Sequence, residues 1–417
     1  MAGGFHVRSE IGTLRKVMLH RPGDELLNLS PDSLAPLLFD DIPYLSEAQR
    51  EHDRFAAMLA QEGVEVVYLE ELVAEALAAC PAAREELVSR WVGECGVAGR
   101  GVREAICDLL EKISDPKALV DKLVEGVRAD ELDLAPCRGM SLADVVMCGD
   151  NLERPLLVDP IPNLYFTRDT FSVIGQGVSF NRMWSATRRR ESVFGQIVLK
   201  YHPDYAGAPI WHTPGSPFHI EGGDILVLGP ATVAIGISER TEAAGIDVLG
   251  KSLLWGEPDS GIRSVIAFSL PKKRAFMHLD TVFTQVDIDR FTVHPGILGA
   301  LCVFELTRGP KEGEVAIRCF DDVPLDEVLA RALGLASVQL IKCGGDDPIA
   351  ASREQWNDGS NTLAVRPGTV FVYQRNSVTN EILYQQGLNL LEIPSAELSR
   401  GRGGPHCMSM AFIRDDL

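Results

Sequence analysis

A cysteine follows a glycine-rich, cationic segment near the C-terminus of the chain. This segment, residues 402–410, reads RGGPHCMSM. Glycines let a ligand approach the backbone closely, and nearby arginine and histidine side chains favour the thiolate over the thiol. Cys407 is therefore the candidate nucleophile. Because most intracellular cysteines are small buried hydrophobic residues, this interpretation depends on partners elsewhere in the chain.

Three other segments supply such partners. They are residues 162–169 (PNLYFTRD), 219–224 (HIEGGD) and 277–281 (MHLDT). Each places an ionisable group beside an aliphatic or aromatic run of strand character, so each can present a polar residue at a strand end. One acidic residue in such a context is usually a solvated edge, but three such sites and a cysteine together indicate a functional site.

Together these segments resemble the arginine deiminases, within the broader family of guanidino-group-modifying enzymes. The resemblance runs over nearly the whole chain, from Leu14–Gly23 through Ser238–Thr241 to the C-terminal cysteine segment. One position departs from the family pattern, because the family commonly has a proline after Met-Ser-Met where this chain has Ala411. The alanine is expected to loosen the backbone after the nucleophile without removing a chemical group.

The resemblance implies hydrolysis of L-arginine to L-citrulline and ammonia, with water as the second substrate and with no cofactor and no metal. Cys407 would attack the guanidinium carbon and form an amidino-cysteine, while His278 would act first as acid and then as base. Glu221 would orient His278 and raise its pKa. Asp169 and Asp280 match the positions whose carboxylates hold the guanidinium group.

The resemblance also implies a second set of positions, which contact the substrate: Asn163, Arg188, Asp224, Arg240, Gly401 and Arg402. Arg188 and Arg240 would pair with the α-carboxylate, Asn163 would contact the same end, and the Gly401 carbonyl would accept from the α-ammonium. Asp224 fits a structural or substrate-proximal acid. Arg402 would either pair with Asp280 in the empty site and move aside on binding, or form a structural salt bridge.

Other functions stay open at this point. A zinc or manganese site would need these side chains to converge: His219, Glu221, Asp224, His278 and Asp280. A relative with the same fold could act on agmatine or methylated arginine, or transfer the amidino group to an amine. The length, the helical insertion and the two carboxylate-binding arginines favour free L-arginine. A non-catalytic binding or scaffolding protein is the remaining class.

Composition limits the class of protein. The chain has 417 residues, 46% of them hydrophobic, and a formal charge of −19, which argues against a nucleic-acid surface. The exception is the basic run Arg188–Arg190, which could capture a substrate carboxylate.

Nine cysteines without metal-knuckle spacing predict a reduced, cytoplasmic location. No signal peptide or membrane span is expected, because the apolar stretch at 225–237 is broken by Gly229-Pro230. A homo-oligomer is compatible with the sequence, which does not determine it.

The pattern of apolar residues predicts an α/β protein with a helical insertion. Apolar positions recur every three or four residues from about 72 to 152, with breaks at Pro81, 93–101, 115–116 and Pro136, which indicates several short helices that shape one side of the site. The predicted division is 1–72 and 155–417 as the catalytic part and 73–154 as the insertion.

Outside the insertion, helices are expected at 46–62, 239–255 and 325–333 among short strands. Ionisable residues follow strand-like runs at Asp169, Glu221, His278 and the segment 344–346, which suggests repeated modules that each deliver a polar residue to a common centre. The family resemblance implies that this centre is the axis of a five-bladed, pseudo-fivefold α/β propeller.

Overall fold

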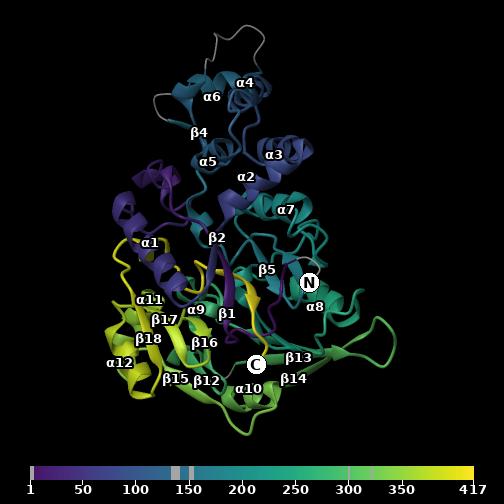
Figure 1. Cartoon of the computed structure of the whole chain (residues 1–417), viewed down its shortest axis with the longest axis vertical. Coiled ribbons are helices and arrows are strands. Elements are labelled where there is room, and N and C mark those ends of the chain that lie inside the picture. The colour runs from purple at the N-terminus through teal and green to yellow at the C-terminus, as the bar shows by residue number, and fades with distance from the viewer. Residues whose placement is uncertain (1–3, 133–140, 150–154, 299–300, 321–322) are drawn as a thin grey trace.

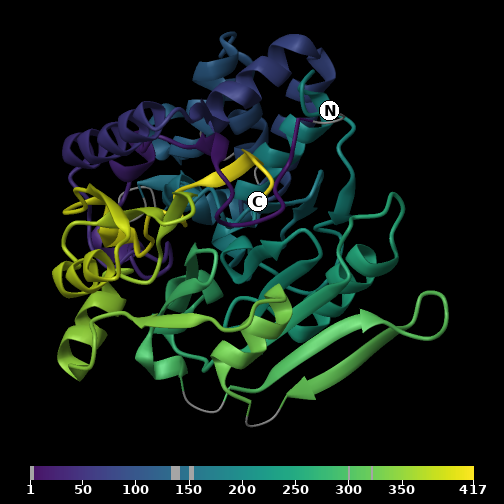
Figure 2. The ribbon, with the colours of Figure 1, turned by 60° about the horizontal axis from the view of Figure 1, so that its bottom comes forward.

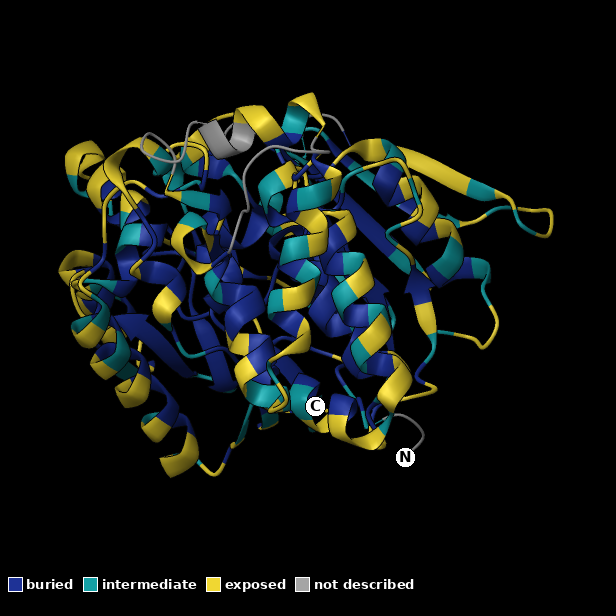
Figure 3. Ribbon diagram, turned by 90° about the horizontal axis from the view of Figure 1, so that it is seen from above, coloured by how far each residue is buried: buried dark blue, intermediate teal, exposed yellow. Residues whose placement is uncertain are grey.

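The computed structural model describes residues 4–132, 141–149, 155–298, 301–320 and 323–417. The protein is α/β, with short strands inside and helices around them (Figure 1). The view from above shows most strands as buried and the helices as exposed on their outer faces, while a strand at the edge of the molecule is exposed (Figure 3). Within the described part of the chain, no helix has both the length and the apolar character that a membrane span needs.

Four of the sheets repeat one arrangement. Two antiparallel strands form a hairpin, and a third strand, which follows a helix, lies parallel to the second strand. These elements are β5 (Phe171–Ile174), β6 (Gly177–Phe180), α7 (Glu191–Tyr201) and β7 (Ile210–His212); β8 (Ile225–Gly229), β9 (Thr232–Ile237), α8 (Ala243–Trp255) and β10 (Ser264–Ser269); β11 (Phe283–Asp287), β12 (Arg290–Val293), α10 (Leu325–Leu333) and β15 (Gln339–Lys342); β16 (Leu363–Arg366), β17 (Thr369–Tyr373), α12 (Ser377–Gln385) and β18 (Asn389–Ile393).

A further sheet joins the two ends of the chain. The C-terminal β19 (Met410–Arg414) is antiparallel to β1 (Leu14–Leu19), which is parallel to β2 (Glu65–Tyr68) after α1 (Leu45–Gln61). Ala411 is buried and pairs with Val17 in this sheet. The expectation of a looser loop at Ala411 is therefore wrong, because the residue lies inside a paired strand.

One sheet extends beyond the repeated arrangement. Strands β13 (Val303–Arg308) and β14 (Val315–Phe320) add to β10, and the sheet runs in the order β14-β13-β10-β9-β8. Figure 2 shows this green hairpin reaching away from the rest of the molecule. The short strands β3 (Val127–Arg128) and β4 (Leu156–Val158) pair at the two ends of the helical segment.

Helices fill the segment between β2 and β4. They are α2 (Leu69–Ala79), α3 (Pro81–Gly93), α4 (Arg100–Glu111), α5 (Pro116–Glu125) and α6 (Leu142–Gly149), and Figure 1 shows α3 to α6 beyond the sheets. Proline occupies the first position of α3 and α5, where its missing N–H is no loss. The predicted breaks at Pro81, 93–101 and 115–116 are confirmed, whereas Pro136 lies outside the described residues. Helices α2 and α3 pack on α7, and apolar residues of both regions form one cluster.

The helix predicted at 239–255 begins later, at Ala243. The preceding residues form a turn instead, in which the Ser238 N–H donates to the Thr241 carbonyl at 3.1 Å. The Ser238 hydroxyl accepts from the backbone N–H of Arg240 at 3.0 Å and of Thr241 at 3.1 Å. A serine that bonds nearby backbone groups in this way competes with helix formation. The turn holds Arg240 at its tip.

Candidate active site

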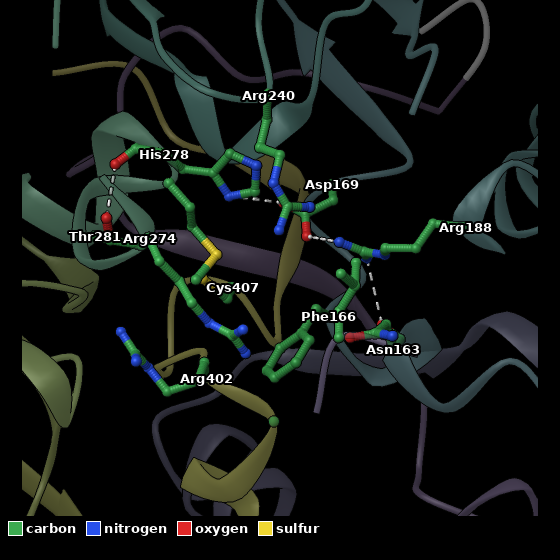
Figure 4. Close-up of a pocket in the computed structure, with 13 residues that line it drawn as sticks. Asn163, Phe166, Asp169, Arg188, Arg240, Arg274, His278, Thr281, Arg402 and Cys407 are labelled. Carbon is green, nitrogen blue, oxygen red and sulfur yellow. Dashed lines mark hydrogen bonds and ion pairs between the residues drawn. The ribbon is translucent and has the colours of Figure 1, made fainter. Parts of the chain in front are cut away.

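Cys407 lies in the turn that precedes β19, and it faces a small cavity (Figure 4). Its backbone N–H donates to Oδ1 of Asn361 at 3.0 Å, and Nδ2 of the same amide donates to Sγ at 3.1 Å. The thiol lies 3.5 Å from Oδ2 of Asp280. The cysteine is therefore fixed through both its backbone and its sulfur.

The electrostatic environment of the Cys407 thiol differs from the one expected from the sequence. Burial, with the carboxylates of Asp280 and Asp169, raises the pKa of Cys407 well above its usual value. His406 turns to Asp280, with Nδ1 2.8 Å from Oδ2, and Arg402 lies over the ring of Trp356. The expectation that the neighbouring arginine and histidine favour the thiolate is wrong for the empty site, because burial and then the acids dominate.

His278 lies among carboxylates. Its Nε2 is 2.8 Å from Oε2 of Glu221, and its Nδ1 is 3.6 Å from Oδ1 of Asp169. Burial alone would lower the pKa of His278, but Asp169, Glu221 and Asp224 raise it to about 9. Burial opposes the ionised form of Glu221 as well, yet His278 and Arg240 lower its pKa to about 2. The pair is an imidazolium and a carboxylate at neutral pH, as predicted for Glu221 and His278.

Arg188 connects two acids in this structure. Its Nη1 donates to Oδ2 of Asp169 at 2.8 Å, and its Nε donates to Oε1 of Glu191 at 2.8 Å. Nη2 also donates to Oε2 of Glu191 at 2.8 Å. Glu191 was not predicted from the sequence. A bidentate pair of this kind fixes the guanidinium plane, so Glu191 sets the orientation in which Arg188 meets Asp169.

Asp280 presents an unsatisfied oxygen. Its Oδ2 accepts from His406, while its buried Oδ1 has no hydrogen-bond partner among the described residues. Burial would raise the pKa of Asp280, but His406 lowers it overall. A buried, ionised carboxylate oxygen without a donor requires a cation or a donor to be stable.

Asp224 lies apart from the cavity. Its Oδ2 accepts from the Ser238 hydroxyl at 2.7 Å, and its Oδ1 accepts from the Leu279 N–H at 2.9 Å, and burial raises its pKa to about 7. It does not line the cavity. Of the two roles expected for Asp224, the structural one is seen, because its oxygens fix the backbone that follows His278, and a contact with substrate stays a prediction.

The other predicted substrate contacts line the cavity: Asn163, Arg188, Arg240, Gly401 and Arg402. Nδ2 of Asn163 donates to the Leu37 carbonyl at 2.8 Å. The Arg240 guanidinium stacks on Trp184 at 4.8 Å, and its Nε has no partner among the described residues. A Cβ at position 401 would lie 2.1 Å from the Tyr165 hydroxyl, so only glycine fits at this wall.

Arg402 lies at the rim of the cavity and does not pair with Asp280. Its guanidinium carbon is 3.6 Å from the centre of the Trp356 ring, and its Nη1 is 3.6 Å from Oδ2 of Asp40. Asp40 also binds Arg274, which lines the same cavity. Of the two predicted arrangements of Arg402, the structural salt bridge is the one seen.

The metal interpretation required a set of ligands that the structure does not bring together. The side chains of Asp169, Glu221 and His278 do approach within 4.8 Å of one another. His219, however, is partly exposed and faces Glu242, with Nδ1 3.7 Å from Oε2. The side chains that do meet are two carboxylates and one imidazole, and His219, Asp224 and Asp280 of the expected ligand set are not among them.

Comparison with known proteins identifies the family. The arginine deiminase family model matches residues 35–414. The chain is 51% identical to the arginine deiminase of Treponema denticola over 415 residues, which cover 99% of each protein. It is 49% identical to the arginine deiminase of Clostridium perfringens, over 99% of this chain and 98% of that protein. The chain belongs to the arginine deiminase family.

Solved structures agree with this family at the level of the fold. An amidinotransferase of saxitoxin biosynthesis from Microseira wollei aligns with a TM-score of 0.55 at 14% identity, over 99% of this chain and 98% of that one. A dimethylarginine dimethylaminohydrolase from Pseudomonas aeruginosa, solved with citrulline, aligns with a TM-score of 0.51 at 14% identity, over 96% of this chain and all of that one.

Each of the site residues in this arginine deiminase family member comes just before the first strand of a sheet. Asp169 precedes β5, Glu221 precedes β8, Asp280 precedes β11, Asn361 precedes β16 and Cys407 precedes β19. The sequence interpretation placed Asp169, Glu221 and His278 after strand-like runs, whereas Asp169 and Glu221 come just before β5 and β8, and His278 comes just before the short helix α9 (Leu279–Val282). It also chose Asp346, which is exposed and pairs with Lys342 at 2.7 Å.

Asn361 was missed, although a polar residue directly before the strand-like run at 363–365 was the available signal. The helical segment of this family member contributes none of the residues that line the cavity among those described. The expectation that it shapes one side of the site is therefore wrong.

Proposed function

We propose that the protein hydrolyses L-arginine to L-citrulline and ammonia. The observation that carries this proposal is a cavity lined by Cys407, the His278 imidazolium and Asp169, with Asp280 in contact with the thiol, in a chain of the arginine deiminase family. Oδ1 of Asp280 lacks a donor among the described residues of the empty site, and a guanidinium ion supplies N–H donors and positive charge in a planar form that carboxylates bind well.

Asp169 and Asp280 hold the guanidinium group in this proposal. The unpartnered Oδ1 of Asp280 accepts from one guanidinium nitrogen. Asp169 accepts from another, on the side where it contacts His278 and Arg188. Two fixed carboxylates hold the central carbon in place over Sγ of Cys407, which removes most of the entropic cost of their encounter.

Substrate binding also activates the nucleophile. The acids that raise the pKa of Cys407 in the empty site are the same acids that the bound cation neutralises. The thiol therefore loses its proton to solvent more readily when the substrate is present. This arrangement keeps the free enzyme in the thiol form, which is less reactive towards other electrophiles.

The reaction then proceeds in two halves. The Cys407 thiolate forms a C–S bond with the guanidinium carbon, His278 donates its proton to the departing nitrogen, and the C–N bond breaks to release ammonia. The amidino-cysteine remains. Neutral His278 then takes one proton from water, whose oxygen attacks the same carbon. The C–S bond breaks, and the remaining hydroxyl proton passes to the departing sulfur, which gives citrulline and restores the thiol. Glu221 stabilises His278 in its charged form.

The amino-acid end of the substrate lies towards Arg240, Arg188, Asn163 and Gly401. Arg240 is the main carboxylate ligand, because Arg188 already binds Glu191 and Asp169. Asn163 contributes its amide, and the Gly401 carbonyl accepts from the α-ammonium. Arg402 closes the rim beside them.

The same proposal includes the architecture around the site. The four sheets that share a hairpin and a parallel third strand, with the sheet β19-β1-β2 that joins the two ends of the chain, are the five blades of a pseudo-fivefold α/β propeller, whose axis passes through the cavity. Residues 1–72 and 155–417 form this part, and 73–154 form an inserted helical subdomain. The cytoplasmic location and the homo-oligomer stay predictions.

The test is an assay of citrulline and ammonia from purified protein and L-arginine, with no added metal and after exhaustive dialysis against a chelator. We expect equal amounts of the two products at an unchanged rate. Absence of citrulline from folded protein would refute the proposal, and activity that returned only with a stoichiometric divalent metal would assign Glu221 and His278 as ligands instead.

A further inference from the structure

A buried polar network contacts Asp280 without lining the cavity. His406 Nε2 lies 3.2 Å from Oε2 of Glu10 and 2.6 Å from Nη2 of Arg168, which itself donates to the same Glu10 oxygen at 3.1 Å. His406 then reaches Asp280 through Nδ1 at 2.8 Å. None of these four side chains is more than 4% exposed. Charged groups buried to this degree are costly unless they are paired in defined geometry.

Glu10 comes from the N-terminal segment, outside residues 35–414 that match the family model. Its Oε1 accepts from the Val227 N–H at 2.9 Å. The segment is held on both sides, since Val7 and Gly175 exchange backbone hydrogen bonds at 2.9 and 2.7 Å. The carboxylate of Glu10 is thus brought from one end of the chain to a point between two segments that carry the site.

Both partners of Glu10 are next in sequence to residues that face the cavity. Arg168 directly precedes Asp169, and His406 directly precedes Cys407. The two segments are also joined by a backbone hydrogen bond of 3.1 Å from the Arg168 N–H to the Cys407 carbonyl. A shift of Glu10 would therefore move the guanidinium-binding acid and the nucleophile together.

We propose that Glu10, Arg168 and His406 are positioning residues that fix the orientation of Asp280 and Cys407 for the proposed reaction, and that the N-terminal segment completes the active site. The inference rests on the proposed function. Arg168 can only donate, so its contact with Nε2 places the ring proton of His406 on Nδ1. That proton is donated to Asp280 Oδ2, which leaves Oδ1 for the substrate.

Two substitutions of His406 separate its contacts. In His406→Asn the amide N–H can still donate to Asp280 but does not reach Arg168 and Glu10. In His406→Gln the longer amide reaches the position of Nε2 but loses the donation to Asp280. We expect kcat/KM for L-arginine to fall roughly 10- to 100-fold in His406→Gln, the cost of a misplaced reacting group, and clearly less in His406→Asn.

The pH profile distinguishes positioning from a purely structural role. The groups that face Asp280 are His406, His278, Arg168, Cys407 and Asp358. Loss of the His406 donor leaves the effect of burial unopposed, so the pKa of Asp280 rises. The acid limb of kcat/KM should then move to higher pH in His406→Gln and stay near its wild-type position in His406→Asn.

Glu10→Gln tests the N-terminal end of the network, and Glu354→Gln is its matched control. Glu354 is also buried and accepts from the N–H groups of Val378 and Thr379 at 2.8 and 2.7 Å. We expect both substitutions to lower the melting temperature, but only Glu10→Gln to lower kcat/KM, about tenfold or more. Equal activity of the two folded variants would overturn the proposal.

A measurement on the wild-type protein keeps the inference testable if the variants do not fold. Nitrogen-15 NMR of labelled imidazoles should show His406 protonated at Nδ1 and bare at Nε2, and the reverse tautomer would refute the proposed donation to Asp280.

Activity assays of the same proteins distinguish failure of the proposed function from failure of the positioning network. If wild-type protein forms no citrulline, the proposed function fails; if it forms citrulline and the folded His406→Gln and Glu10→Gln variants match it, the positioning network alone fails.

Discussion

The cavity and the helical segment at 69–149 are both well buried, but for opposite reasons. In the helical segment, apolar side chains such as Val102, Ile106 and Leu110 repeat along one face of α4 and pack away from water. In the cavity, the buried groups are ionised side chains held in pairs, such as Glu221 with His278. Apolar burial stabilises a fold, whereas buried charge costs free energy and is kept where chemistry needs it.

This difference predicts which substitutions should affect activity and which should affect stability. The acids around the cavity have two effects, because they raise the pKa of His278 and also that of Cys407. Both effects favour the protonated forms, so the empty site holds His278 as an imidazolium and Cys407 as a thiol. Substitutions there should change activity more than stability, and substitutions in the helical segment should do the reverse.

The largest expected effect is that of Cys407→Ser. An alcohol has a pKa far above that of a thiol, so it cannot supply the anion, and kcat should fall by about 10⁴-fold or more. The thermal unfolding curve should stay close to that of the wild type. Mass spectrometry of wild-type protein quenched during turnover should find the amidino adduct on the Cys407 peptide. An adduct on another cysteine, or robust turnover by the serine variant, would remove Cys407 from its role.

A second expected effect concerns the pH dependence of alkylation. In the free enzyme, burial and the acids Asp280 and Asp169 raise the pKa of Cys407, so reaction with neutral iodoacetamide should increase with pH up to well above 9. A cationic amidine reagent should react at a lower pH, because it neutralises the acids as it binds.

The control for this experiment is Asp280→Asn. It removes one of the acids, so it should increase the rate with iodoacetamide at neutral pH while it lowers the rate with the cationic reagent. The same pH profile for both reagents in the wild-type protein would contradict the electrostatic account of the cavity.

Substrate choice should give a third, smaller effect. Agmatine has the same guanidinium group as L-arginine but lacks the α-carboxylate. Two charge-assisted pairs are lost, each worth on the order of 1.5 to 3 kcal/mol, so kcat/KM for agmatine should be lower by roughly two to four powers of ten.

Arg240→Ala should decrease the rate with L-arginine much more than the residual rate with agmatine. Arg188→Ala should decrease both rates, because Arg188 also binds Asp169. Comparable kcat/KM for both substrates in the wild-type protein would move the assignment to an agmatine-type relative.

These contrasts also show what the sequence could and could not predict. The helical period and the proline positions gave α3 and α5 correctly, because these signals are local. The resemblance gave the residues that face the cavity, including Cys407 and His278. The pair of Arg188 and Glu191 is three residues apart, so a local signal was present in the sequence and was missed. The contact of Arg402 with Trp356 could not be predicted, because it joins segments that are distant in sequence.

The raised pKa of Cys407 had the opposite sign to the sequence-based expectation for the same reason. Residues that are adjacent in sequence suggested a cationic environment, but in space the sulfur is buried and lies 3.5 Å from Oδ2 of Asp280. Local composition is thus a poor guide to the electrostatics of a site that several distant segments build together.

The smallest expected effect on activity comes from the helical segment, with Ile106→Ala. Ile106 is fully buried on α4, so the truncation should lower the free energy of unfolding by about 2 to 5 kcal/mol, from lost apolar burial and the cavity that remains. Since no described residue of the segment lines the active site, kcat and KM for L-arginine at 25 °C should stay within about twofold of the wild type. Leu253→Ala on α8 is the matched control outside the segment, because Leu253 is buried to a similar degree. Chemical denaturation followed by circular dichroism gives the change in stability, and the citrulline assay gives the rates. If Ile106→Ala lowered kcat in fully folded protein more than it lowered stability, the helical segment would be coupled to the cavity, and the separation of packing from chemistry drawn here would not hold.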